Sequence, residues 1–150
     1  MYIEINLKSE LAFYNLEGKW NDYIGIQKSV INTLKATRFF DNNVVKNEIS
    51  NMFIRINPKG IKETLGSSKR FQTLPRKLKE LKIATLRSLP DIIRHGVLTE
   101  DNVPNTHRNN SLFAYITNNI KIDEYTYQVR VSIKKKVGSN IFWIHNIDCK

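Results

Sequence analysis

The sequence predicts an α+β protein in which N-terminal helices pack on a C-terminal antiparallel sheet of about four strands. Apolar and polar residues alternate in the last third of the chain, most clearly from Tyr125 to Lys134. Apolar residues recur at helical spacing earlier, from Ile26 to Thr37 and from Leu74 to Leu89. The 150 residues suit one domain. We divide it into a helical and extended segment, residues 1–50, packed on a core of residues 51–150.

The charge of the chain indicates a polyanionic partner. The formal net charge is +10, and the hydrophobic fraction of 41% is enough for a packed core. Between Lys59 and Arg94, ten Lys or Arg residues stand against three acids. Such an excess is typical of proteins that bind nucleic acid, an anionic membrane surface or an acidic protein.

Other features exclude several classes. The single cysteine, Cys149, excludes an internal disulfide framework and a cysteine-based zinc site. No apolar run is long enough to span a membrane, and no signal-peptide pattern is present. We therefore expect no membrane partner and action in a cytoplasm, either that of the producing cell or that of a target cell.

The first fifty residues carry weak signals. Residues 1–7 alternate and predict a strand, and Ser9 to Leu16 suits a short helix. The helix predicted from Ile26 to Thr37 should end before Asp41-Asn42-Asn43. We find no candidate chemistry in this segment.

A short strand from Met52 to Ile56 should lead into a helix that Asn57-Pro58 begins and Gly66 ends. Its first turns present Lys59 and Lys62. Ammonium groups beside free backbone N–H groups could hold a phosphate. The alternative is that both lysines are simply solvated.

Thr73-Leu74-Pro75 should begin the longest helix, and Ser88-Leu89-Pro90 a shorter one that ends at Gly96. Thr99 to Asn110 is polar and predicts a loop. The polar side of the longer helix is basic, which favours a surface that binds a phosphate backbone over a merely solvated face. Its cations are Arg76, Lys77, Lys79, Lys82 and Arg87.

Three strands should follow, joined by turns at Asp123-Glu124 and Val137–Asn140; they span Leu112–Ile122, Tyr125–Lys134 and Ile141–Ile147. Centring the first turn on Asp123-Glu124 places apolar residues opposite apolar residues, as a sheet with one buried face requires. The same register places Tyr115 opposite Ser132 and Thr117 opposite Arg130.

The second turn would place Ser132 opposite His145, Lys134 opposite Trp143 and Arg130 opposite Ile147. Cross-strand neighbours lie about 4.5–5.5 Å apart at Cβ. The polar face would then bring together five side chains with no carboxylate among them. These are Tyr115, Thr117, Arg130, Ser132 and His145.

This set suits chemistry on a phosphodiester. Arg130 and a nearby Lys would stabilise charge on phosphoryl oxygens, and His145 could move a proton near neutral pH. Trp143 or Tyr115 could stack a base. No cluster of acids able to hold Mg²⁺ accompanies them, which favours metal-free, cofactor-free RNA cleavage through the substrate's 2′-OH.

Alternatives stay open. A histidine on a strand is often structural, and His95 sits at a predicted helix C-terminus, where the dipole favours a cation anyway. The same charges would also suit a non-catalytic RNA- or DNA-binding module. A third class is an interaction protein whose basic face meets an acidic partner.

Three stretches carry a resemblance to a known superfamily: Phe53 to Thr64, the helix Leu74 to Leu98, and Phe113 to Ile147 with its Tyr-x-Val-x-Val core at residues 127–131. Together they resemble the barnase, EndoU, colicin and RelE-like RNase fold. More narrowly, the chain is similar to versions found in phage polyvalent proteins and in C-terminal toxin domains of contact-dependent inhibition systems. The resemblance covers roughly residues 50–148.

The resemblance implies a ribonuclease toxin that acts on tRNA and is neutralised by an acidic immunity protein or antitoxin. By position, Lys62, Arg130, Ser132 and His145 match places that catalytic residues occupy in such enzymes, and His107 could match a histidine carried on a loop. The glutamate base of the barnase type has no counterpart that the sequence identifies.

Overall fold

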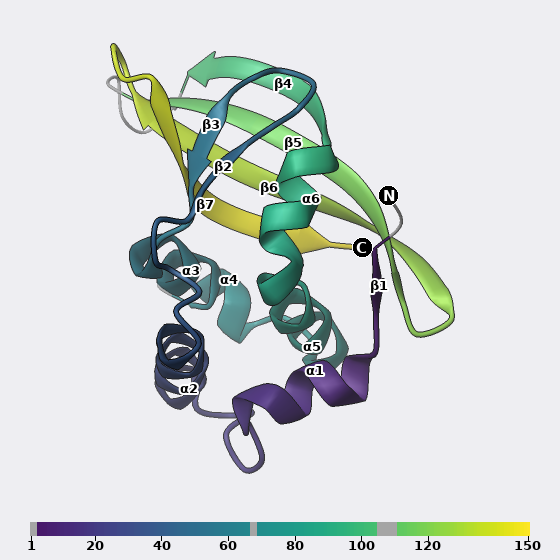
Figure 1. Cartoon of the computed structure of the whole chain (residues 1–150). Coiled ribbons are helices and arrows are strands. Elements are labelled where there is room, and N and C mark those ends of the chain that lie inside the picture. The colour runs from purple at the N-terminus through teal and green to yellow at the C-terminus, as the bar shows by residue number, and fades with distance from the viewer. Residues whose placement is uncertain (1–2, 67–68, 105–110) are drawn as a thin grey trace.

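A curled, mixed sheet organises the fold. The computed structural model describes residues 3–66, 69–104 and 111–150, and over these residues the sheet has seven strands in the order β1-β5-β6-β7-β3-β2, with β4 also on β5. The α+β class is confirmed. The expected sheet of about four antiparallel strands is wrong, because there are more strands and because β1 and β3 pair in parallel with their neighbours. Figure 1 shows α1 to α5 grouped at one end of the sheet, with α6 crossing in front of it.

Three long antiparallel strands form the centre of the sheet: β5 (Ser111–Ile122), β6 (Tyr125–Lys136) and β7 (Ile141–Cys149). β5 and β6 pair without interruption. Tyr115 lies opposite Ser132, and Thr117 lies opposite Arg130, so the predicted register of the first hairpin is confirmed.

The second hairpin contains a β-bulge. Lys134 lies opposite Trp143 as predicted, but the register shifts by one residue between Ser132 and Ile133. Ser132 therefore faces Asn146, and the predicted pairing of Ser132 with His145 is wrong.

The shift persists to the end of β7, where Arg130 faces Asp148, so its predicted pairing with Ile147 is also wrong. The cause is packing. Ile144 and Ile147 are both fully buried and lie opposite Ile133 and Val131, on the same face of the sheet. Residues three apart in a regular strand point to opposite faces, so one extra residue is needed to bury both.

Two strands share the outer edge of β5: β4 (Val97–Pro104) is antiparallel to it, and the short β1 (Glu4–Ile5) is parallel. The loop predicted from Thr99 to Asn110 is therefore wrong for residues 99–104. Two register shifts interrupt the pairing of β4, and this irregularity hides the alternation of a strand. Residues 105–110, including His107, lie outside the described residues.

The opposite edge of the sheet adds β3 (Phe53–Arg55), parallel to β7, and then β2 (Val44–Lys46), antiparallel to β3. The sequence predicted β3 but not β2. In β3, Ile54 is fully buried, while Arg55 is exposed and lies opposite Trp143 of β7.

The helices supply the other half of the core. Predicted helices form near residues 9, 26, 57, 74 and 89, although α2 rather than α5 is the longer one. Within the described part of the chain, no helix has the length and apolar character needed to cross a membrane. The helices are α1 (Leu7–Tyr14), α2 (Tyr23–Ala36), α3 (Pro58–Thr64), α4 (Lys69–Gln72), α5 (Arg76–Ala84) and α6 (Leu89–His95).

Helix α3 docks on the edge of β7 where β3 stops. Asn57 caps it as predicted, since its Oδ1 accepts a hydrogen bond from the backbone N–H of Gly60 at 2.8 Å. Gly60 passes so close to β7 that a Cβ there would lie 2.6 Å from the carbonyl oxygen of Ile144. One turn later, the Thr64 hydroxyl accepts the backbone N–H of Ile147 at 3.0 Å. A side chain thus completes the hydrogen bonding of the strand edge.

A buried polar network extends this contact to α5. The Thr64 Oγ1 and Asn146 Oδ1 atoms lie 3.1 Å apart, and Lys82 Nζ donates to the same Asn146 oxygen at 2.9 Å. Only 4% of Lys82 is exposed. The expected basic face of this helix is therefore incomplete, because Lys82 is internal and Arg87 forms an ion pair with Glu10 at 2.6 Å.

We predict that Thr64→Val lowers the free energy of unfolding by about 1–3 kcal/mol, because the substitution keeps the shape but leaves the buried N–H of Ile147 without an acceptor. Urea denaturation measures the effect. Thr126→Val, at an exposed position of β6, is the matched control and should change stability little. Equal effects of the two substitutions would contradict this role for Thr64.

Candidate active site

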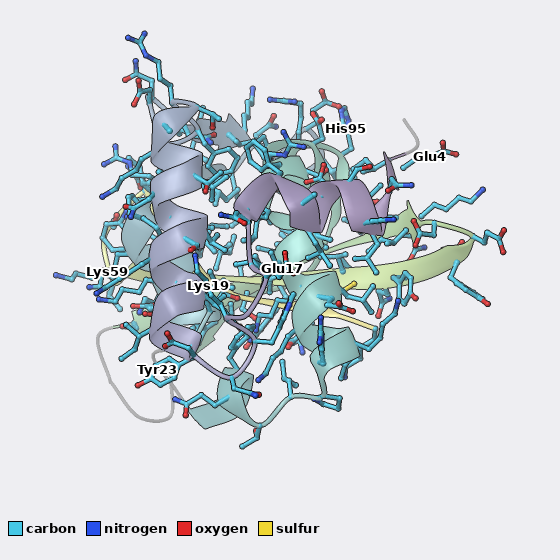
Figure 2. All side chains as sticks on the ribbon, turned by 90° about the horizontal axis from the view of Figure 1, so that it is seen from below. Glu4, Glu17, Lys19, Tyr23, Lys59 and His95 are labelled. Atoms are coloured by element: carbon cyan, nitrogen blue, oxygen red, sulfur yellow. The ribbon has the colours of Figure 1, made fainter. Side chains whose placement is uncertain are left out.

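A basic pocket of about 350 Å³ lies where β3, α3, β6 and β7 meet. Five cationic side chains and one carboxylate, that of Glu63, line it, together with polar and apolar groups. Three residues predicted to bind substrate, Lys59, Lys134 and Trp143, are among the lining residues. Lys59 is exposed and lies at the edge of the molecule in Figure 2. The cations are Arg55, Lys59, Lys134, Lys135 and Lys136.

One row across three strands defines the pocket wall. Trp143 on β7 has Arg55 on β3 as its neighbour on one side and Lys134 on β6 on the other. Directly paired residues share a face of the sheet, so the indole ring lies between two cations. Arg55 projects outward because the alternation of β3 buries Ile54.

Glu63 connects this pocket to His145. Its Oε2 lies 3.1 Å from His145 Nδ1 and 3.5 Å from Lys134 Nζ. An ionised carboxylate can only accept hydrogen bonds. The contact therefore assigns the proton of a neutral His145 to Nδ1 and leaves the Nε2 lone pair available. His145 does not line the pocket itself but contacts Glu63, which does.

The surroundings of His145 act on its pKa in opposite directions. Partial burial lowers the pKa from the ordinary 6.5, the hydrogen bond with Glu63 opposes this, and the positive charge of Lys134 lowers the pKa further. The net direction is downward. The imidazole is therefore neutral near pH 7, as a general base must be.

The predicted aromatic and cationic residues of the sheet face form a second group beside His145. The Phe113 ring lies 5.2 Å from the His145 ring and 6.4 Å from the Tyr115 ring, which it stacks on. The Arg130 guanidinium lies 3.8 Å over Tyr115. Tyr115 and Arg130 thus lie on the same surface as His145, and the Phe113 ring connects them to it.

The structure places the other predicted residues less centrally. Ser132 is only 8% exposed, Thr117 is half-buried with its hydroxyl 3.5 Å from that of Thr99, and Lys62 is exposed but does not line the pocket. His107 lies outside the described residues.

Sequence reasoning missed Glu63, and with it the carboxylate that the predicted set lacked. A signal was present, because Glu63 is four residues after Lys59 and therefore lies on the same helix face. Arg55 was also missed, although it alternates with Ile54 and Ile56, both buried. Among the described residues, no group of three or more His, Cys, Asp or Glu side chains is arranged to hold a metal ion.

The fold and the site together define an α+β protein with a basic pocket and an adjoining histidine–carboxylate pair. The model of the family described as large polyvalent protein-associated domain 3 matches residues 26–142, and the chain belongs to this family. The polyvalent-protein part of the resemblance is thereby confirmed. The matched segment contains Glu63 and Lys134 but ends before Trp143 and His145. No curated protein and no solved structure matches the chain.

We predict that His145 titrates below 6.5 in the folded protein, as measured by NMR of its ring protons. Glu63→Gln should lower this pKa further, because it removes the charge that favours the imidazolium. Lys134→Met should raise the pKa, because it removes a repelling cation.

The same shift makes stability depend on pH. Between the folded and the unfolded pKa, the unfolded chain binds more protons, so stability should fall as the pH is lowered through about 6.5. A wild-type pKa of 6.5 or above would contradict this description of His145, as would a raised pKa in Glu63→Gln or a lowered pKa in Lys134→Met.

Proposed function

We propose that the chain is a metal-independent endoribonuclease that cleaves RNA through attack of the substrate's own 2′-OH. The observation that carries the proposal is the 3.1 Å contact between His145 and Glu63 beside a pocket wall rich in cations. Proton transfer and stabilisation of phosphoryl charge are the two requirements of this reaction, and the two groups of residues supply them side by side.

In the proposed reaction, His145 Nε2 takes the proton from the 2′-OH. The O2′ atom forms a bond to phosphorus, and the bond from phosphorus to O5′ breaks. The products are a 2′,3′-cyclic phosphate and a 5′-hydroxyl, whose proton comes from water. The hydroxide that remains takes the proton from the His145 imidazolium, which restores the neutral base. Glu63 holds the imidazole in the required tautomer and stabilises the imidazolium that forms, in the manner of an orienting carboxylate.

Lys134 and Arg55 would neutralise the phosphoryl oxygens as charge develops on them. Lys134 Nζ also lies 3.5 Å from Glu63 Oε2, so this contact fixes the position of the cation relative to the pair of Glu63 and His145. The predicted catalytic role of Arg130 becomes a binding role in this scheme. Its guanidinium lies over the Tyr115 ring, which stacks on Phe113, and it is the Phe113 ring that lies beside His145.

The resemblance suggests tRNA as the substrate and an acidic immunity protein or antitoxin as the partner. Charge supports both expectations, since the pocket is lined by five cations and one carboxylate within a chain of net charge +10. A toxin role remains part of the same proposal.

The test is incubation of purified protein with total RNA and with tRNA in EDTA, followed by mapping of the ends. Wild-type protein should produce 2′,3′-cyclic phosphate ends, and His145→Ala should reduce the rate by about 10²-fold or more, the usual contribution of a general base. Thermal unfolding of both proteins confirms that the variant is folded.

His95→Ala is the matched control. His95 also pairs with a glutamate, Glu48 at 3.3 Å, and Figure 2 shows it far from Lys59 and hence from the pocket. This variant should keep full activity. Activity that requires added metal, or full activity in His145→Ala, would sink the proposal. RNA that binds with strong salt dependence but stays intact would identify a non-catalytic binding module instead.

A further inference from the structure

We infer that the basic pocket is a subsite for one unpaired nucleotide, whose base stacks on Trp143 while its two flanking phosphates contact Arg55 and Lys134. The inference rests on the proposed function in that it names the form of RNA that the site accepts. It predicts a preference for single strands over duplexes, which the cleavage chemistry alone does not require.

The order of residues along the pocket wall is the first argument. Arg55, Trp143 and Lys134 are direct neighbours across β3, β7 and β6, in that order. A nucleotide within a chain presents phosphate, base and phosphate, so a cation on each side of an aromatic ring matches one such unit. Two cations without the ring between them would bind any polyanion equally well.

The size of the pocket is the second argument. A volume of about 350 Å³ is near the lower end of the roughly 300–1,000 Å³ of small-molecule sites. One nucleotide can enter such a space, whereas a base that stays stacked within a double helix cannot reach the indole ring. Proteins that bind single-stranded nucleic acid without preference for its base sequence also stack the bases on aromatic side chains.

The position of the pocket relative to the acid–base pair is the third argument. Glu63 lines the pocket and contacts His145, and Lys134 contacts Glu63. A phosphate on Lys134 would therefore lie next to the acid–base pair. The nucleotide on Trp143 would then adjoin the scissile phosphate, and the subsite would select where the chain is cut.

The test measures binding without cleavage. The chain has two tryptophans, so Trp20→Phe leaves the fluorescence of Trp143 alone. The probes are 2′-deoxy oligonucleotides, which cannot be cleaved because they lack the attacking hydroxyl. A single-stranded oligothymidylate should quench the fluorescence, and a hairpin duplex with the same number of phosphates should leave it nearly unchanged.

Anisotropy of a labelled oligothymidylate gives the affinity of otherwise wild-type variants. Trp143→Leu should weaken binding by about tenfold, and Trp143→Phe should restore most of the loss, because it retains a stacking ring. The dependence of affinity on salt should be unchanged in Trp143→Leu, since the phosphate contacts remain. Trp20→Phe is the control, because Trp20 packs under Arg76, away from the pocket, and its loss should not alter affinity.

Equal quenching by the duplex, by inorganic polyphosphate or by polyglutamate would overturn the inference, as would unchanged affinity in Trp143→Leu. Failure of the proposed function looks different. Single strands would then bind through Trp143 as described, while RNA stays intact in the cleavage assay. Conversely, if RNA is cleaved but Trp143 contributes nothing to binding, the proposed ribonuclease activity stands and the proposed nucleotide subsite is wrong.

Discussion

The docking of α3 against the edge of β7 is the contact on which the rest of the site depends. β3 pairs with β7 only as far as Trp143, and α3 takes over the edge beyond it. Gly60 allows the approach, and the Thr64 hydroxyl satisfies the backbone N–H of Ile147. Between these two contacts, the helix presents Glu63 to His145. One short helix therefore closes the strand edge and supplies the carboxylate of the site.

The β-bulge at His145 serves packing and also shapes the candidate site. Burial of both Ile144 and Ile147 demands an extra residue in β7, and His145 is that residue, between the paired positions Ile144 and Asn146. Asn146 is held by Thr64 and Lys82, so the bulge is anchored from two helices. The anchored backbone fixes the imidazole beside Glu63. Bulges next to functional sites commonly redirect a side chain in this way.

The sequence predicted the centre of the fold better than its edges. Strict alternation and the Asp123-Glu124 turn were enough to fix the pairing of β5 with β6, because a one-residue slip would have exposed the whole apolar face. The bulge could have been noticed, since Ile144 and Ile147 have a spacing that no regular strand can bury. The helix face of Glu63 could have been predicted from its spacing to Lys59, but its contact with His145 could not. Local patterns do not show where α3 docks, and this contact joins segments 82 residues apart.

The most direct measurement for the central claim is a double-mutant cycle on cleavage in EDTA, with Glu63→Gln, His145→Gln and the two combined. If the two residues act as one unit, either single substitution removes most of the activity, and the double variant is no slower than His145→Gln alone. Losses that multiply in the double variant would mean that the two side chains act independently, and they would contradict the histidine–carboxylate pair as the centre of this site.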